Sequence, residues 1–593
     1  MGWRPTEGQI VKGSLGLALL LYLVLVVAVL PSHAFFDSDP GVKFLQVRNL
    51  VAHRWQGLWV DDPGEALDPS HVFSPFNTSF FYRDGETGRV YGVYSVPFVV
   101  ITGLFYGLLG FYGLYLLPML ATLGTMVVTY RLSRRVAPRT APLAPLLVGV
   151  LSPLLFYSVD LWEHTPAVFL AVLGLWGVVE ALIRGRTRWL LGAGLVLGLA
   201  AWFRAETYAL IPACGLAILW AERRRPRRLA AYGLAYGAGL ALVLLPIGAF
   251  QEWVFGSPLG PHLQNAVVPQ VNGQVARKVN MHPLALWALR SVVATKLLVP
   301  WTTSRSWTAL VAGLVLLRLL AGRIPGWRRA LTLLLAGAAS LGTMGVVLMG
   351  VWEHWFARNL VQSFPLLLFL LFLGLAPEPQ AASVAAASGE RRARVRLLAL
   401  IGGLFTAFVL VTTPSSGGPQ WGARFLMPVY PLLVVGVLYT LEPVLASRPR
   451  RPLESWALLL AFLLLGGASA LTQFEGLRRL YWSKADYARL TQAIEQLAPE
   501  VVVTDTWWMP LVTATASEPK TWFLVNHGRN GSLADLVTML RERGVTQFAY
   551  VTTPEGASPL SSDLSAGYLV EQARHTERVW IDVLFITYAL ARP

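Results

Sequence analysis

The chain has 593 residues, of which 55% are hydrophobic and only 14% are charged. A soluble domain carries about 25% charged residues, so the composition excludes an ordinary soluble enzyme and predicts a polytopic membrane protein. The formal net charge of +16 would favour nucleic acid only if the basic residues shared one stripe or face. They lie instead in short clusters between apolar runs, and we expect no nucleic-acid partner. The lone cysteine, Cys214, excludes an internal disulfide.

The first apolar run, residues 14–30, follows two basic residues. A secretory signal peptide has the same order, but its apolar core has only about 7–15 residues. The length of the run favours an uncleaved first span near 12–33.

Further apolar runs of span length, or slightly shorter, follow along the chain, and together they predict about 13 transmembrane helices. The later spans are expected near 112–132, 141–158, 166–184, 189–203, 207–221, 229–249, 303–322, 330–350, 358–376, 397–412, 425–446 and 454–472. With a cytoplasmic N-terminus, every arginine cluster falls on the cytoplasmic side, which is the positive-inside pattern. The apolar run 93–110 lacks a basic flank, and we interpret it as re-entrant or lying at the membrane interface.

The first outer loop, residues 35–111, is long and opens with "FFDSDPGVKF", which contains Asp37 and Asp39. An aspartate next to proline is often a helix cap, and Asp39 is a candidate for that role. Apolar residues then recur at helical spacing, with a polar stripe opposite them that includes Lys43, Gln46 and Asn49. The pattern predicts an amphipathic helix that lies flat at the membrane surface.

The composition changes after Thr472, so we divide the chain into a transmembrane domain, 1–472, and an outer domain, 473–593. Buried strands are expected at "VVVT" (501–504), "WFLV" (522–525), "FAYVTT" and "WIDVLFITY", with a capped helix from Ser532 to Gly544. These elements predict a small extracytoplasmic α/β domain. Asp505, at a strand end, is expected to be a turn residue.

Ionisable residues gather at the outer ends of several predicted spans, and such residues near the membrane interior are functional candidates because they are costly there. They are Asp37, Asp39, Glu163, His164, Arg204, Glu206, Glu353, His354, Arg358 and Arg424. Arginine suits phosphate because its guanidinium stays charged and offers paired donors. A carboxylate suits a general base that takes a proton from a hydroxyl. The combination indicates a lipid-linked sugar phosphate and a hydroxyl acceptor.

Each of these residues also has a structural interpretation. Glu163 and His164 would serve as partners that hold span ends together, and Arg204 and Arg424 would extend to the interface without further function. The two "WEH" triplets contain zinc-ligand residue types, but neighbouring residues point apart, unlike ligands at i and i+4. We therefore expect no metal site, a divalent metal being the less favoured alternative.

Several longer stretches resemble a known family in their order and spacing. They are "FFDSDPG", "YGVYSVPFVVITGLFYGLLG", "YSVDLWEHTPAVFLAVLG", "LVLGLAAWFRAETYALIP" and "WGARFLMPVYPLL". Over most of residues 10–450 the chain resembles the GT-C superfamily of integral-membrane glycosyltransferases. Its bacterial members include protein O-mannosyltransferase-like and lipid A aminoarabinose transferase-like enzymes.

The resemblance implies an α-helical polytopic membrane fold and a polyprenyl-phosphate sugar donor, with no required cofactor. It implies a catalytic base in the first loop, which falls on Asp39 first and Asp37 second. Many relatives carry the two acids side by side, whereas Ser38 separates them here. Basic residues near outer span ends would hold the donor phosphate, and the other polar residues would line the same cavity. The phosphate ligands would be Arg204, Arg358 and Arg424, and the supporting residues Glu163, His164, Glu206, Glu353 and His354.

We therefore expect a glycosyltransferase of the bacterial inner membrane, with a cytoplasmic N-terminus, membrane lipid around it and a glycan, lipid or protein as acceptor. One alternative is a transporter or flippase of a lipid-linked substrate, which would often show internal repeats with interrupted helices; the sequence shows none. The other is an envelope-assembly scaffold whose 473–593 domain binds a partner.

Overall fold

The structure is a computed structural model, and it describes most of the chain. The described residues are 6–261, 270–271, 274–275, 305–354, 356–375, 382–412, 418, 420–447, 452–517, 520–525, 531–554 and 569–590. The predicted outer positions 413–417 and 555–568 lie outside them.

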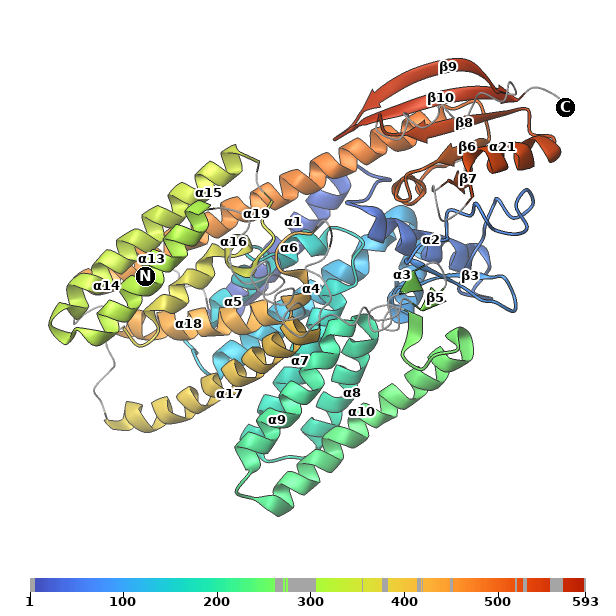
Figure 1. Cartoon of the computed structure of the whole chain (residues 1–593). Helices are drawn as coiled ribbons and strands as arrows, with labels where there is room; N and C mark the ends of the chain where they lie inside the picture. Colours follow the sequence, from blue (N-terminus) through green and yellow to red (C-terminus); the bar gives the residue numbers. More distant parts are fainter. Residues whose placement is uncertain are drawn as a thin grey trace. The chain divides into compact units, whose positions relative to one another are not determined.

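Helices dominate the described part of the chain (Figure 1). Nine of them there are long and apolar enough to cross a membrane. These spans are Glu7–Val29, Val96–Arg134, His164–Arg184, Pro226–Phe255, Arg305–Arg323, Arg328–Trp352, Gly389–Thr412, Val429–Ala446 and Leu453–Glu495. The predicted helical membrane fold with a C-terminal sheet is confirmed, but the predicted count of 13 spans is not.

Four of the 13 predicted spans are not among the nine. The runs 189–203 and 207–221 form α8 (Arg188–Phe203) and α9 (Leu210–Glu222), which have 16 and 13 residues and are shorter than the about 20 residues of a full span. The runs 141–158 and 358–376 do not form one long helix. The run 141–158 contains α5 (Ala144–Gly149) and α6 (Leu154–Ser158), separated at Pro153, because proline lacks the N–H that a helix interior needs. The run 358–376 contains α16 (Leu360–Ser363) and then a 3₁₀ helix, Pro365–Phe372. The run 93–110 forms α3 (Val96–Leu109), which leads through a 3₁₀ turn into α4 (Leu116–Arg134).

The chain divides into two compact units, which we describe separately. The helical unit comprises 1–24, 117–249 and 280–478, and the loop–sheet unit comprises 25–116, 250–279 and 479–593. The first loop and the C-terminal region therefore belong to one unit.

Small residues allow close helix packing in the helical unit. Helix α7 (His164–Arg184) packs on α8 (Arg188–Phe203), and α8 packs on α10 (Pro226–Phe255). A Cβ added at Gly194 would lie 2.3 Å from the carbonyl oxygen of Tyr236, and one at Gly239 would lie 2.2 Å from that of Leu191. Only glycine permits this backbone approach, which is a common device between membrane helices. The other helices of this unit are α1 (Glu7–Val24), α9 (Leu210–Glu222), α13 (Arg305–Arg323), α14 (Arg328–Gly337), α15 (Thr343–Trp352), α17 (Ala382–Thr412), α18 (Val429–Ser447) and the first part of α19 (Pro452–Glu495).

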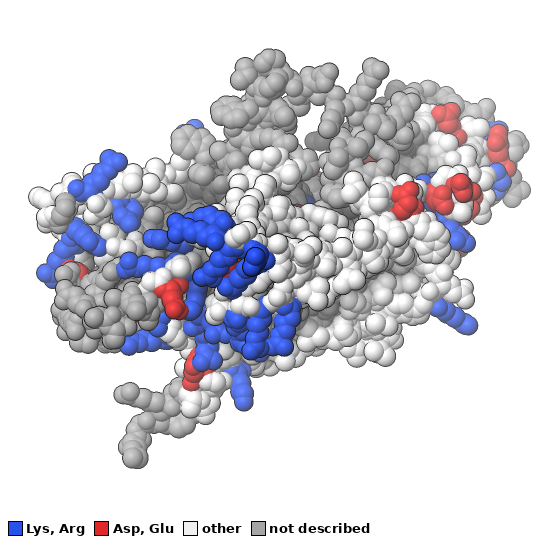
Figure 2. All heavy atoms as spheres, turned by 90° about the horizontal axis from the view of Figure 1, so that it is seen from below, with Lys and Arg blue, Asp and Glu red and all other residues white. Residues whose placement is uncertain are grey.

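Arginine clusters that are distant in sequence meet in the helical unit. Arg135 and Arg184 both pair with the buried carboxylate of Glu180, at 2.7 and 2.6 Å, and Arg394 donates to the carbonyl oxygen of Arg135 at 3.0 Å. Figure 2 shows one face on which many Lys and Arg side chains gather. The contacts place three of the predicted basic clusters at one end of the helices, as the positive-inside pattern requires.

In the loop–sheet unit, α2 (Ser38–Ala52) is enclosed rather than surface-lying. Lys43, Gln46 and Asn49, which we expected on an outward polar stripe, are 0%, 3% and 6% exposed. A Cβ at Gly41 would lie 2.0 Å from the carbonyl oxygen of Leu511 in α20 (Met509–Val512), so the helix packs directly on the C-terminal region. Strands β1 (Trp59–Val60), β2 (Phe81–Arg83) and β3 (Val90–Gly92) form a small antiparallel sheet beyond α2, in the order β1-β3-β2.

The C-terminal sheet has five strands in the order β7-β6-β8-β10-β9. Strands β6 (Val501–Thr504), β7 (Thr521–Leu524) and β8 (Gln547–Thr552) are parallel, whereas β10 (Asp582–Leu590) pairs antiparallel with β8 and with β9 (Leu569–Arg578). Helix α21 (Leu533–Glu542) packs on one face, and the end of α19 with α20 packs on the other. The sequence did not predict β9, because its exposed, charged side chains lack an apolar alternation.

Candidate functional site

The two acids of the first loop have different local roles. Asp37 is the N-cap of α2, in extended backbone conformation, and its Oδ1 accepts a hydrogen bond from the backbone N–H of Asp39 at 3.0 Å. Asp39 lies in the first helical turn and is half-buried. The cap that the sequence suggested for Asp39 is therefore made by Asp37, two residues earlier.

Lys43 lies one turn beyond Asp39 in α2, and residues four apart share one helix face. Its side chain is fully buried, with Nζ 4.3 Å from the ring centroid of Tyr94. Lys43 is therefore a buried basic residue one helical turn from Asp39. We missed it because its helical phase placed it on the expected solvent stripe.

A second lysine is buried in the same unit. Lys484, in the C-terminal part of α19, donates to the hydroxyl of Tyr115 at 3.0 Å and lies 4.7 Å from the centroid of that ring. Tyr115 in turn contacts Phe111, which packs against Phe35 and Phe44 at centroid distances of 5.8 and 6.1 Å. The polar start of α2 thus packs against an aromatic cluster. The sequence pattern of residues 473–495 did not indicate that Lys484 would be buried against this cluster.

In the helical unit, Arg204 is bound on two sides by carboxylates. Its Nη1 donates to Glu163 at 2.6 Å, and its Nε donates to the two oxygens of Glu206 at 2.9 and 3.1 Å. Arg204 and Glu163 are buried, and the Arg204 side chain is only 6% exposed. The three residues, all predicted site residues, form one cluster with a formal charge of −1. Arg204 is therefore an internal ion-pair centre more than an open anion ligand.

Four residues near the start of α7 form a second buried group. His164 stacks on Tyr157 at 4.9 Å and meets the Trp162 ring edge-on at the same centroid distance. The Trp162 indole N–H donates to Asp160 at 3.0 Å, and Asp160 is fully buried. Sequence reasoning missed Asp160, although a carboxylate three residues before Glu163 in "YSVDLWEH" was a usable signal.

Arg424, which is far from this group in the sequence, lies next to Trp162. Its guanidinium lies 5.5 Å from the Trp162 ring centroid and 5.2 Å from that of Phe425. The preceding turn is fixed, since Gly422 has φ = +73° and the backbone N–H of Ala423 donates to the Tyr430 hydroxyl at 3.2 Å.

Trp421 anchors the same turn. Its carbonyl oxygen accepts from the Tyr157 hydroxyl at 3.0 Å, and its indole N–H donates to Gln473 at 3.2 Å. A Cβ at Gly476 would lie 2.6 Å from the Trp421 ring. Arg424 is thus held beside Trp162 on a turn that is fixed by these contacts.

The predicted residues at 353–358 have different partners. Glu353 and Arg358 are exposed, and the Arg358 guanidinium lies 5.3 Å from the Phe356 ring centroid. His354 has a left-handed backbone, with φ = +55°, and its Nδ1 hydrogen-bonds to Arg478. Arg478 also pairs with the fully buried Glu475, which the sequence did not single out.

Comparison with known proteins gives one family match. Residues 98–249 match the family described as Dolichyl-phosphate-mannose-protein mannosyltransferase, and this range includes Asp160, Glu163, His164, Arg204 and Glu206. No curated protein matches the chain.

Solved structures with a similar trace include the oligosaccharyltransferase AglB from Archaeoglobus fulgidus, in complex with an inhibitory peptide and a dolichol-phosphate. It has 13% identity and a TM-score of 0.49 over 91% of this chain and 69% of that chain. ArnT from Cupriavidus metallidurans, bound to undecaprenyl phosphate, has 12% identity and a TM-score of 0.48 over 98% of both chains. The family match over residues 98–249 confirms the resemblance to GT-C membrane glycosyltransferases.

Proposed function

We propose that the chain is a membrane glycosyltransferase that moves a sugar from a polyprenyl-phosphate donor to an acceptor hydroxyl. The observation that carries the proposal is the family match over residues 98–249, in a chain with nine candidate membrane spans among its described residues. The family description favours a hexose, mannose in particular, as the transferred sugar.

Asp39 is the proposed general base. It would take the proton of the acceptor hydroxyl, whose oxygen forms a bond to the anomeric carbon while the bond from that carbon to the phosphate oxygen breaks. Polyprenyl phosphate leaves with the electron pair. Asp39 is preferred to Asp37 because the carboxylate of Asp37 already accepts the N–H that begins α2.

Arginine would stabilise the charge that grows on the leaving phosphate. Of the three candidates, Arg424 fits this role best, since it lies half-buried on a rigid turn. Arg358 is exposed and comes second. Arg204 would act through its cluster, with Glu163 and Glu206 holding it and the helix ends that carry them. His164, Glu353 and His354 remain proposed cavity residues.

The proposed setting is the bacterial inner membrane, with the N-terminus in the cytoplasm and the acids, arginines and C-terminal domain at the outer side. The transfer needs no cofactor, so a chelator should leave the rate unchanged.

The test is single-turnover transfer by purified protein in detergent, with labelled polyprenyl-phosphate mannose and a mixed pool of glycan, lipid and peptide acceptors. We expect labelled acceptor and free polyprenyl phosphate in equal amounts. Movement of labelled donor across a vesicle membrane, with no transfer to any acceptor, would contradict the proposal and favour a transporter.

A further inference from the structure

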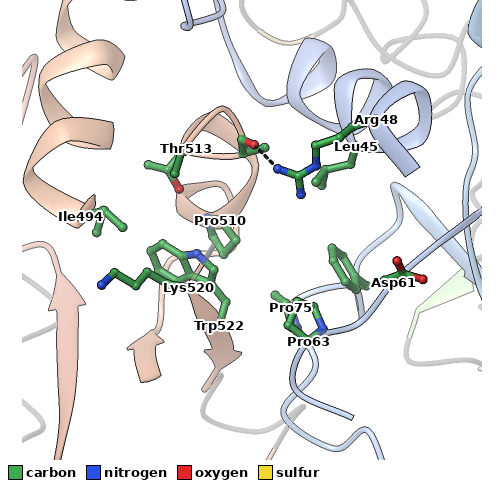
Figure 3. A pocket seen from close by; sticks show the side chains of 13 residues that line it. Leu45, Arg48, Asp61, Pro63, Pro75, Ile494, Pro510, Thr513, Lys520 and Trp522 are labelled. Atoms are coloured by element: carbon green, nitrogen blue, oxygen red, sulfur yellow. Dashed lines mark hydrogen bonds between the residues drawn. The ribbon is translucent and has the colours of Figure 1, made fainter. Parts of the chain in front are cut away.

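The loop–sheet unit contains a hollow that does not include Asp37 or Asp39 and is a candidate binding site (Figure 3). It is open to solvent, and the empty space of about 550 Å³ that it encloses includes part of that solvent. Its lining comes from α2, from the loop that follows it, from the end of α19, and from the segment that runs from α20 into β7. The residues that matter for the argument are Arg48, Asp61, Pro510, Lys520 and Trp522.

The hydrogen-bonding groups at the hollow are only partly used by the protein. Within the described part of the chain, Arg48 makes one hydrogen bond, from Nη1 to the carbonyl oxygen of Ala514 at 3.0 Å, which leaves four of its five N–H donors. Burial lowers the pKa of Arg48, and the nearby carboxylate of Asp61 opposes that effect. Asp61 pairs with His53 at 2.9 Å, and its side chain remains 61% exposed.

The walls of the hollow are aromatic and apolar. Trp522 is half-buried, and its indole N–H donates to no residue that the structure describes. Pro63, Pro75 and Pro510 also line the hollow. Proline has no N–H, so these three residues offer no main-chain donor to an extended peptide.

The charges favour an uncharged ligand over phosphate. Figure 3 shows the Lys520 side chain running away from Arg48, and its Nζ donates to the carbonyl oxygen of Leu497 at 2.8 Å. Figure 3 shows Arg48 and Asp61 on one side of the hollow and Trp522 on the other. The charged groups that remain at the hollow are therefore one guanidinium and one carboxylate, with no excess positive charge. A sugar ring has an apolar C–H face and several hydroxyls. The C–H face suits the Trp522 indole, and the hydroxyls suit the donor Arg48 and the acceptor Asp61.

We propose that this hollow is an accessory saccharide subsite, which binds an uncharged sugar unit of a glycan acceptor. The apolar C–H face of the sugar would pack on Trp522, and its hydroxyls would accept from Arg48 and donate to Asp61. The acceptor role rests on the proposed function, and it narrows the acceptor class to glycans.

The subsite is separate from the reacting centre. Arg48 lies nine residues after Asp39 in the same helix, which is about 13 Å along the axis and on the opposite side of the helix. A single sugar cannot occupy both places. Acceptors of several sugar units should therefore bind more tightly than a monosaccharide.

The experiment measures binding of neutral manno-, gluco- and N-acetylglucosamine oligosaccharides to the purified full chain by calorimetry, without donor. We expect one series to bind and its affinity to rise with length. Trp522→Leu and Arg48→Gln should each weaken Kd about tenfold or more, and Trp522→Phe, which keeps an aromatic face, should lose less. Trp580→Leu is the matched control, an exposed tryptophan of the same unit that does not line the hollow.

No binding by any series would overturn the subsite, as would binding that none of the hollow variants changes. A proline-rich peptide that binds and loses affinity in the same variants, when no saccharide binds, would also overturn it. Thermal unfolding of each variant confirms that it is folded. The binding assay needs no donor, so the two proposals can fail independently. Saccharide binding without any sugar transfer would support the subsite and refute the proposed enzyme activity. Sugar transfer without saccharide binding would support the enzyme activity and refute the subsite.

Discussion

Asp37 and Asp39 divide two tasks at the start of α2. Asp37 Oδ1 accepts the backbone N–H of Asp39 at 3.0 Å, so the first acid organises the helix that presents the second. Asp39 lies in the first helical turn, where the positive end of the helix dipole stabilises its negative charge.

This division predicts opposite phenotypes for the two acids. Asp39→Asn should leave the fold intact and lower single-turnover transfer by at least about 10²-fold, the lower end of general-base contributions. Asp37→Ala should instead lower the free energy of unfolding by about 0.5–2 kcal/mol through loss of the cap, whereas Asp37→Asn retains an acceptor oxygen and should lose less. Transfer rate and thermal unfolding are measured for each variant. Full transfer by Asp39→Asn would remove Asp39 from the mechanism.

The Arg204 cluster predicts a stability effect. Replacement of Arg204 by Gln would leave Glu163 and Glu206 buried without their cation, and breaking such a buried pair costs about 3–5 kcal/mol. Combining it with Glu163→Gln and Glu206→Gln should restore much of the loss, because no unpaired charge then remains. The measurement is the midpoint of thermal unfolding in detergent. If Arg204→Gln alone unfolds like the parent but binds donor poorly, Arg204 is a phosphate ligand and our ranking is wrong.

The hydrophobic pattern predicted the elements that bury one face, such as α21, or all of their residues, such as β6. Strand β6 covers the predicted residues 501–504, and α21 begins after Ser532, which forms a reciprocal capping box with Asp535. Such signals are local, so they survive without knowledge of the fold.

The sequence could not show which polar residues the fold would enclose. Lys43 and Gln46 have a helical phase typical of a solvent face, but segments distant in sequence cover it: the Gln46 side chain donates to the carbonyl oxygen of Gly92 at 3.1 Å, and Lys43 meets Tyr94. Likewise nothing near Arg204 in the sequence reveals Glu163, which is 41 residues away. The candidate residues were predictable by type and position along a span, whereas their pairing depends on tertiary contacts.

The proposed orientation can be tested with introduced cysteines, because the native Cys214 is fully buried and should contribute little background. Ser70 is exposed in the first loop, and Arg224 is exposed between α9 and α10. In intact cells whose outer membrane is permeabilised, Ser70→Cys should react with an impermeant maleimide and Arg224→Cys should not. Arg224→Cys should react once the inner membrane is opened. The reverse pattern would invert the topology and place the acids in the cytoplasm.

Arg424 gives the sharpest test of donor binding. Its guanidinium lies against Trp162 on the turn fixed by Gly422, and thermal unfolding of each variant separates an effect on donor binding from an effect on the fold. Loss of a charge-assisted contact costs about 1.5–3 kcal/mol, or about one to two decades in Kd for polyprenyl-phosphate mannose. Arg424→Lys keeps the charge but not the paired donors, and should recover only part of the affinity. Arg224→Ala, an exposed arginine at the basic end of the helical unit, is the matched control and should bind donor like the parent. Donor binding by Arg424→Ala at parental affinity, with Arg358→Ala weakened instead, would transfer the phosphate contact to Arg358.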